Sequence, residues 1–265
     1  MPIALDHIVQ TVADLEAACA GLESIGLRTV PGGRHAHWGT HNALCHLGLT
    51  YIELLAIEDR AVAEGSTFGR AVIAEEARGD GIWRLALRTG DIMAVVGKAR
   101  AAGIRCNGPV PGYRERPDGS VLRWSLAFLE MPDADFVPPM LIDWHETDRL
   151  RMADLVARGI AGPSPRAVVG GIAIACRDPE ETAEWMRKAF GLVAHEAATR
   201  SYGEALRISL RGGDILLCGG PSAPPAVQAA HALRGERPFA VHLSAGDDTD
   251  GEVRIGGALY THAAL

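Results

Sequence analysis

The sequence lacks several features that would assign it to common functional classes. It has no run of Lys or Arg that could follow a phosphate backbone, and its 26 basic and 33 acidic side chains give a net charge of −7. We therefore expect no nucleic-acid partner. No apolar stretch approaches the length of a membrane span, and the N-terminus has neither the basic segment nor the apolar core of a signal peptide. These absences predict a soluble, cytoplasmic protein without a membrane partner.

Cysteine is scarce, and the common catalytic motifs are missing. The five cysteines are far apart and form no CxxC pair, which favours buried, reduced thiols over a disulfide framework. No GxSxG, Walker loop, GxGxxG or Ser-His-Asp signature occurs in a fitting context. The chain does have a hydrophobic content of 48% over 265 residues, which is enough for a substantial core.

An internal repeat organises the chain. A strand-like run, a capping aspartate, an amphipathic segment and a glycine recur three times, with the caps at Asp14, Asp91 and Asp178. The spacing from cap to glycine is 12, 12 and 13 residues. Three short strand-like segments follow each glycine, so each unit is predicted to be βαβββ within an α+β fold.

The first two units are predicted at residues 3–58 and 81–146, joined by a helical connector near residues 60–78. Together they are expected to form one domain over residues 1–150. The turn in the second unit is expected at the segment Pro117, Asp118 and Gly119, whose residues favour turns.

The remainder of the chain is predicted to hold a linker and a second repeat region. Residues 151–166 end in a Gly- and Pro-rich stretch and are expected to be a linker. Residues 167–265 contain the third unit and a truncated fourth. The fourth unit has no amphipathic segment after its first strand, so it is expected to have lost its helix while keeping strands near residues 252–256 and 258–262.

His7 and Glu53 are the first candidates for a site. Both lie in apolar runs with strand-like alternation, where an imidazole and a carboxylate are costly to bury without a partner. A divalent metal would satisfy both, and His46 is the next candidate ligand. Alternatively, His7 is a core histidine that bonds to Glu53 without a metal and leaves a binding cavity.

Histidines are concentrated between these two residues. Four of the ten histidines lie between residues 35 and 46. We expect His35 and His46 to face the site, and His37 and His41 to lie in a solvated loop. The neighbouring residues expected at the mouth of the pocket are Trp38, Thr40 and Asn42.

A hairpin in the second unit combines guanidinium and indole groups. Arg114 and Arg116 lie on alternate residues before the turn, and Trp124 lies opposite them. Such a face would suit a carboxylate-bearing or aromatic substrate, although either arginine alone could equally be solvated.

These motifs resemble a known family. The tandem unit opens with LDHIV and closes with YIELL, and GGRHAHWGTHNALCHLGLTYIELLAI is followed by RERPDGSVLRWSLAF. This sequence resembles the glyoxalase-like domain group of the vicinal oxygen chelate superfamily, over residues 3 to about 146. The resemblance implies that paired units curl into open barrels, with the site on the concave surface. His7 and Glu53 match two of the four glyoxalase-type metal-ligand positions.

The second unit departs from that pattern. It has Arg84 where the family has its second histidine-type ligand position, and Asp143 where the family has glutamate. Arginine cannot ligate a cation, so we expect either an ion pair between Arg84 and Asp143 or a contact of Arg84 with a substrate anion. The third unit has Gly171 and Leu216 at these positions, which predicts a structural role.

The resemblance implies a lyase or isomerase that depends on a divalent metal such as Mg, Mn, Fe, Ni or Zn. The expected ligands are His7 and Glu53, with His46 and Asp143 as further candidates. The expected substrate is a small oxygen-rich or carboxylate-bearing metabolite, and Glu53 and His7 are the expected catalytic residues. A ring-cleaving dioxygenase is disfavoured because only one histidine occupies a matched position.

Two other functions stay open at this point. A metal-free protein could sequester a small molecule in the same cavity, and its mark would be a His7–Glu53 contact without an ion. Alternatively, the degenerate units could serve only as a dimerisation scaffold, and a homodimer is possible in either case.

Overall fold

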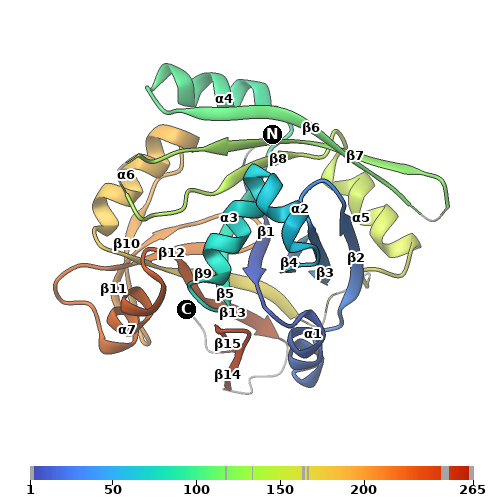
Figure 1. Cartoon of the computed structure of the whole chain (residues 1–265). Coiled ribbons are helices and arrows are strands. Elements are labelled where there is room, and N and C mark those ends of the chain that lie inside the picture. The colour runs from blue at the N-terminus through green and yellow to red at the C-terminus, as the bar shows by residue number, and fades with distance from the viewer. Residues whose placement is uncertain are drawn as a thin grey trace.

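Two β-sheets organise the chain (Figure 1). The computed structural model describes residues 3–116, 118–132, 134–162, 165, 167–245 and 251–262. The first sheet contains β1 (Ala4–Thr11), β2 (Val30–His35), β3 (Thr40–Leu47), β4 (Thr50–Ile57), β5 (Gly81–Arg88), β6 (Cys106–Glu115), β7 (Val121–Leu129) and β8 (Met140–Asp143). The second contains β9 (Ala167–Cys176), β10 (His195–Thr199), β11 (Gly203–Ile208), β12 (Asp214–Gly219), β13 (Pro238–Ala245), β14 (Glu252–Ile255) and β15 (Ala258–Thr261).

The described helices connect or cover these strands. They are α1 (Leu15–Ser24), α2 (Arg60–Gly65), α3 (Thr67–Glu76), α4 (Ile92–Ala101), α5 (Asp148–Ala157), α6 (Pro179–Phe190) and α7 (Pro225–Arg234). None of the helices in the described part of the chain has the length and apolar character needed to cross a membrane.

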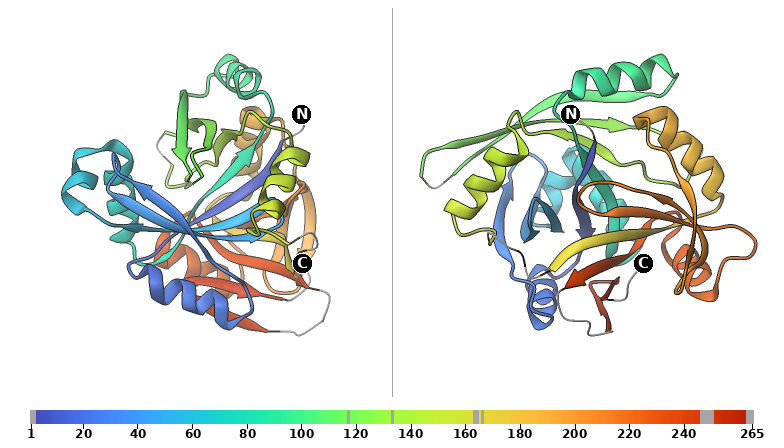
Figure 2. Two further views of the ribbon diagram at one scale, coloured as in Figure 1. Left: turned by 90° about the vertical axis from the view of Figure 1, so that its right-hand side faces the viewer. Right: turned by 180° about the vertical axis from the view of Figure 1, so that it is seen from behind.

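The strand order confirms the tandem repeat. The first sheet runs β2-β3-β4-β1-β5-β8-β7-β6, and the second runs β10-β11-β12-β9-β13-β15-β14. In each complete unit the first strand pairs parallel with the last, as in β1 with β4 and β9 with β12. Neighbouring units join through antiparallel first strands, β1 with β5 and β9 with β13. Both sheets are curled, as the views in Figure 2 show.

The predicted aspartates cap the helices of the three complete units. Asp14 accepts a hydrogen bond from the backbone N–H of the third residue of α1, and Asp91 does the same for α4. Asp178 accepts from two backbone N–H groups at the start of α6. Gly191 ends α6 in the left-handed conformation, with φ of 73°. These local signals explain why the sequence spacing located the helices correctly.

The fourth unit is degenerate, as predicted. It contains β13, β14 and β15, and its described residues include no helix. Strand β15 pairs parallel with β13 and so takes the place of the closing strand of a complete unit.

The two sheets share one core. Each sheet contributes one face to this core, and the helices α1, α4 and α6 pack on those faces. Typical core residues are Ile8, Leu22, Ile174, Met186 and Val241. The opposite face of each sheet carries its own apolar cluster. We call the face of the first sheet that carries Val9, Leu55, Ala86, Leu126 and Ile142 the first cup. The corresponding face of the second sheet carries Ala173, Leu216 and Ala240, with Val227 of α7 packed on it.

The predicted linker begins inside a helix that packs against the first sheet. Helix α5 lies beside β2 in Figure 1 and in the rear view of Figure 2. Asp154 of α5 pairs with Arg116 at 2.8 Å, and Arg158, just after the helix, pairs with Asp118 at 2.7 Å. Pro117, the first residue of the predicted turn, lies outside the described residues. The division of the chain into domains on either side of residues 151–166 stays a prediction.

Candidate active site

The structure brings His7 and Glu53 together in the first cup. Nε2 of His7 is 3.5 Å from Oε2 of Glu53, and the two side chains are 2% and 14% exposed. The His7 ring stacks on Tyr51, with 4.6 Å between ring centroids. A histidine and a carboxylate from neighbouring strands therefore converge on one face of the sheet, as the alternation of β1 and β4 requires.

Asp6 is a third residue of this site, and the sequence pattern did not predict its contact with His7. In a regular strand Asp6 and His7 would point to opposite faces, but the pairing of β1 with β5 skips Asp6, which forms a β-bulge. Its Oδ1 lies 2.8 Å from Nδ1 of His7. Oδ2 accepts hydrogen bonds from Nε1 of Trp144 at 3.0 Å and from Nη1 of Arg151 at 3.1 Å.

These contacts fix the charge of Asp6 and the orientation of His7. Burial raises the pKa of Asp6, but Arg151 and the bond from His7 outweigh it and hold that pKa well below its usual range. An ionised Asp6 accepts the Nδ1–H of His7. Nε2 is then the atom that faces Glu53, and it has no hydrogen-bond partner of its own.

Glu53 is held from its other side by Asn42. Nδ2 of Asn42 donates to Oε1 of Glu53 at 2.5 Å. The amide Oδ1 of Asn42 is buried without a partner. One carboxylate oxygen is thus fixed and the other faces His7, which orients Glu53 toward the interior of the cup.

Arg84 lies on the same face with no partner for its charge. No hydrogen bond or ion pair joins it to another described residue, and its Nε is buried. Its Cζ lies 4.6 Å from the ring centroid of Trp83 and 5.7 Å from that of Phe128. Burial lowers the pKa of Arg84 to about 10, so the side chain stays protonated at neutral pH.

Asp143 does not lie in the first cup, and its predicted role as a metal ligand is wrong. Its Oδ1 accepts from the backbone N–H of His145 at 2.9 Å, and its Oδ2 accepts from that of Ile92 at 3.3 Å. Ile92 begins α4, on the core side of the sheet. Ile142, one residue earlier, faces the cup instead. The predicted ion pair between Arg84 and Asp143 is therefore absent from the described residues.

His46 lies near the pair but is separated from it by an aromatic ring. Tyr51 stands between His46 and His7 in the sheet, and the His46 and Tyr51 rings are 4.8 Å apart. Burial lowers the pKa of His46 to about 4. This histidine lines a small cavity of about 80 Å³ together with Tyr51, Arg114, Arg116 and Trp144. It does not join His7 and Glu53 as a third ligand.

The other predicted pocket residues border the site. Nδ1 of His35 is 2.9 Å from Oγ1 of Thr40, and burial lowers the pKa of His35. Trp38 packs against Phe68 of α3, with 4.5 Å between their centroids. His37 is exposed in the turn between β2 and β3, as predicted. His41 was predicted in the same solvated loop but lies in β3 and is half-buried.

The hairpin arginines are already engaged. Arg114 donates through Nη1 to the carbonyl oxygen of Gly32, and Arg116 pairs with Asp154. Trp124 packs near Trp144, at 5.7 Å between centroids. Of the arginines predicted for substrate binding, only Arg84 is without a protein partner among the described residues.

The residues present do not fit the divalent metal that the resemblance implies. No group of three or more His, Cys, Asp or Glu side chains arranged for a metal ion occurs in the described part of the chain. His7 and Glu53 supply two donors, and the position of a further ligand holds the guanidinium of Arg84, which repels cations. This donor set suits an anion better than a metal.

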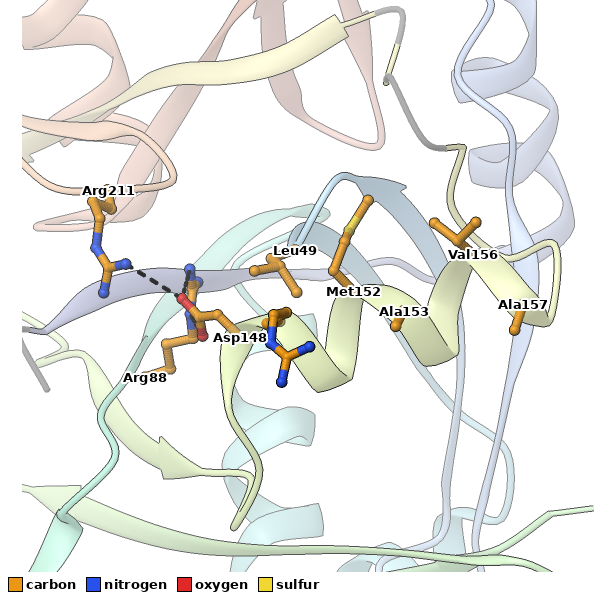
Figure 3. Close-up of a pocket in the computed structure, with 9 residues that line it drawn as sticks. Leu49, Arg88, Asp148, Met152, Ala153, Val156, Ala157 and Arg211 are labelled. Carbon is orange, nitrogen blue, oxygen red and sulfur yellow. Dashed lines mark hydrogen bonds and ion pairs between the residues drawn. The ribbon is translucent and has the colours of Figure 1, made fainter.

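A second, open groove lies away from these residues (Figure 3). Its volume is about 840 Å³, and Leu49, Met152 and Val156 form its apolar part. Asp148 there pairs with Arg88 at 3.0 Å and with Arg211 at 3.5 Å. None of the predicted site residues lines this groove.

Comparisons with known proteins agree with the fold. The structure of a hypothetical protein from Staphylococcus aureus superposes with a TM-score of 0.79 and 20% identity, covering 98% of each chain. A variant of 4-hydroxymandelate synthase from Streptomyces coelicolor gives a TM-score of 0.61 at 15% identity, over 93% of this chain and 72% of that one. Methylmalonyl-CoA epimerase from Mycobacterium tuberculosis gives 0.41 at 26% identity, over 53% and 87%.

No curated protein sequence matches the chain. The family model described as "Glyoxalase-like domain" matches residues 5–190, which include both complete units of the first sheet and the start of the third. The chain therefore belongs to the glyoxalase-like domain family.

Proposed function

We propose that the first cup binds a small carboxylate-bearing metabolite and moves a proton on it, as an isomerase or lyase. Arg84 holds the carboxylate, and Glu53 with His7 transfers the proton. The observation that carries this proposal is the guanidinium of Arg84, which is half-buried on aromatic rings and has no ionic partner among the described residues.

A half-buried guanidinium without an ionic partner favours an anionic ligand. Removing a charge from water is costly unless an opposite charge and hydrogen bonds replace the water. Trp83 and Phe128 contact Arg84 and orient it, while no protein acceptor occupies its donors. A guanidinium offers a planar pair of N–H donors that matches the two oxygens of a carboxylate.

Glu53 is placed to act on the carbon beside that carboxylate. Val9 pairs with Glu53 on one side and with Arg84 on the other, so the two residues are separated by two strand spacings, about 10 Å between backbones. Both side chains extend into the cup and shorten that gap, which suits a molecule of a few carbons.

The proposed chemistry needs only groups of this chain. Glu53 removes a proton from the carbon next to the bound carboxylate, and the positive charge of Arg84 stabilises the enolate that forms. The proton returns from Glu53, or from His7 after exchange across their contact, to the same or the neighbouring atom. His7 stays oriented by Asp6 throughout. Loss of a β-substituent in place of reprotonation would make the reaction a lyase.

Deuterium exchange tests this proposal. Lactate and malonate, which both carry hydrogen on the carbon next to the carboxylate, are incubated with the protein in D₂O, and exchange at that carbon is followed by NMR. We expect exchange with the unaltered protein, and a loss of at least 100-fold in Glu53→Gln and in Arg84→Met. Arg187→Met, which changes an exposed arginine paired with Glu184 on α6, is the matched control. Equal exchange rates in all four proteins would overturn the proposal.

The metal-free binding function is a second candidate, and one observation favours it. His7 is bonded to Asp6 and Glu53 accepts from Asn42, so each side chain has a protein partner without any ion. Binding of the carboxylates through Arg84 without exchange at carbon would identify sequestration as the function. The cytoplasmic location, the homodimer and the absence of a nucleic-acid partner stay predictions.

A further inference from the structure

A buried ionic cluster connects the fourth unit to the first cup. Glu75 of α3 accepts a hydrogen bond from Nη2 of Arg237 at 2.8 Å and from Nη2 of Arg234 at 3.2 Å. All three residues are at least 94% buried. Arg234 ends α7 and Arg237 immediately precedes β13, so the two arginines come from the degenerate fourth unit and the helix before it.

Helix α3, which carries Glu75, packs against the apolar residues around Arg84. Val72 of this helix packs in the apolar cluster of the first cup with Trp83, the ring on which Arg84 lies. Glu75 follows Val72 by three residues and therefore shares its helix face. Phe68, one turn earlier, contacts the Trp83 ring at 5.6 Å between centroids. The negative charge of Glu75 raises the pKa of Arg84, and the positive charge of Arg237 lowers it.

Arg237 is fixed on every side. Its Nε and Nη2 both donate to Glu75, and its Nη1 donates to the backbone carbonyl oxygens of Asp135 and Glu236. These bonds engage four of the five N–H groups of its guanidinium. Arg78 also approaches Glu75, at 3.8 Å, but it is partly exposed and pairs more closely with Asp135, at 3.1 Å.

We propose that Arg237 and Arg234 keep Arg84 available to substrate by holding Glu75. Without them, Glu75 would be a buried carboxylate with two cationic neighbours left. These are Arg78, which pairs with Asp135, and Arg84, which has no ionic partner among the described residues. Arg84 would pair with Glu75 and no longer bind an anion. The fourth unit, which has lost its helix and its own site, thus serves the site of the first sheet. This inference rests on the proposed role of Arg84, and Arg234 and Arg237 are positioning residues in it.

A rescue experiment tests this arrangement. The dissociation constant of malonate is measured by calorimetry for the full chain and for Arg237→Met, Glu75→Gln and the double variant. We expect Arg237→Met to weaken binding at least tenfold and Glu75→Gln to bind at least as tightly as the unaltered protein. The double variant should return to within threefold of the unaltered protein, because it has no carboxylate to capture Arg84. A merely structural role of Arg237 would give no such rescue.

The other outcomes are equally decisive. Malonate binding that is unchanged in Arg237→Met, or that stays weak in the double variant, would overturn the inference while leaving the role of Arg84 intact. Binding that is absent from the unaltered protein, or unaffected by Arg84→Met, would overturn the proposed function and this inference with it. If Arg237→Met does not fold, Arg234→Met removes the bond that Arg234 donates to Glu75, and we expect a loss of about threefold that Glu75→Gln restores.

Discussion

Glu53 and Arg84 are the two cross-strand neighbours of Val9, one on each side of β1. A carboxylate with a histidine beside it thus faces an unpaired guanidinium across a single apolar side chain. In the family pattern both positions would serve a metal. Here one of these positions holds Arg84, which cannot ligate a cation, and we propose that it binds an anion instead.

Arg84 should contribute little to stability because it has no partner. We expect Arg84→Met to leave the free energy of unfolding unchanged or to raise it by about 1 kcal/mol, since an apolar chain replaces a half-buried charge. Urea denaturation followed by circular dichroism measures this change. A loss of more than about 2 kcal/mol would mean that Arg84 has a structural partner after all.

Asp6 should be one of the most sensitive positions in the chain. Asp6→Asn leaves Arg151 buried without its anion and removes the charged acceptor of the His7 Nδ1–H, so we expect a loss of about 3–5 kcal/mol. The pKa of Asp6 is lowered in the folded state, so its stabilisation is present above the unfolded value near pH 4 and is lost as the pH falls below it. Asp6→Asn should therefore flatten the acid limb of the stability curve below pH 4.

The control for Asp6 is another aspartate. Asp178→Asn changes an exposed helix cap, and asparagine caps as well as aspartate does, so we expect a change within about 0.5 kcal/mol. If both variants lost the same small amount of stability, the buried network around Asp6 would not have the strength inferred for it.

His46 should make stability depend on pH in a higher range. Its pKa is about 4 in the folded protein against 6.5 for a free imidazole, so the unfolded chain binds more protons between these values. Stability should then rise with pH between about 4 and 6.5, by up to about 3 kcal/mol. His46→Gln should remove this slope, whereas His195→Gln, at an exposed position, should retain it. Parallel slopes in the two variants would assign the effect to other groups.

Chelation should leave the proposed ligand binding intact. Because the described residues supply no third donor beside His7 and Glu53, we expect EDTA treatment to change neither the melting temperature nor the affinity for malonate. Metal analysis of protein purified without chelator tests the alternative, that the site holds a divalent metal. Stoichiometric divalent metal that disappears in His7→Ala and in Glu53→Ala would restore the metal centre that the resemblance implies.

The parts of the fold that depend on local signals could be predicted from the sequence. Asp14, Asp91 and Asp178 are capping residues with an amphipathic segment behind them, and such signals do not depend on distant contacts. The absence of a helix from the described residues of the fourth unit was predictable for the same reason, because no amphipathic segment follows β13 in the sequence. The convergence of His7 and Glu53 followed from the repeat and from strand alternation.

The parts of the site that depend on strand pairing could not be predicted. The pairing of β1 with β5 skips Asp6 and Trp83, and a bulge depends on the partner strand as much as on its own residues. The resulting Asp6–His7 bond was therefore missed. Asp143 was misplaced because a shift of one residue moves a side chain to the other face. The link of Glu75 to Arg237 joins residues 162 positions apart, and no local pattern reveals it.

The central claim is that Arg84 binds a carboxylate, and isothermal titration with malonate tests it most directly. We expect the dissociation constant of Arg84→Met to exceed that of the unaltered protein by at least 30-fold, since a charge-assisted pair contributes about 2 kcal/mol or more. Arg187→Met should bind as the unaltered protein does. Equal affinity in Arg84→Met and Arg187→Met would contradict the account.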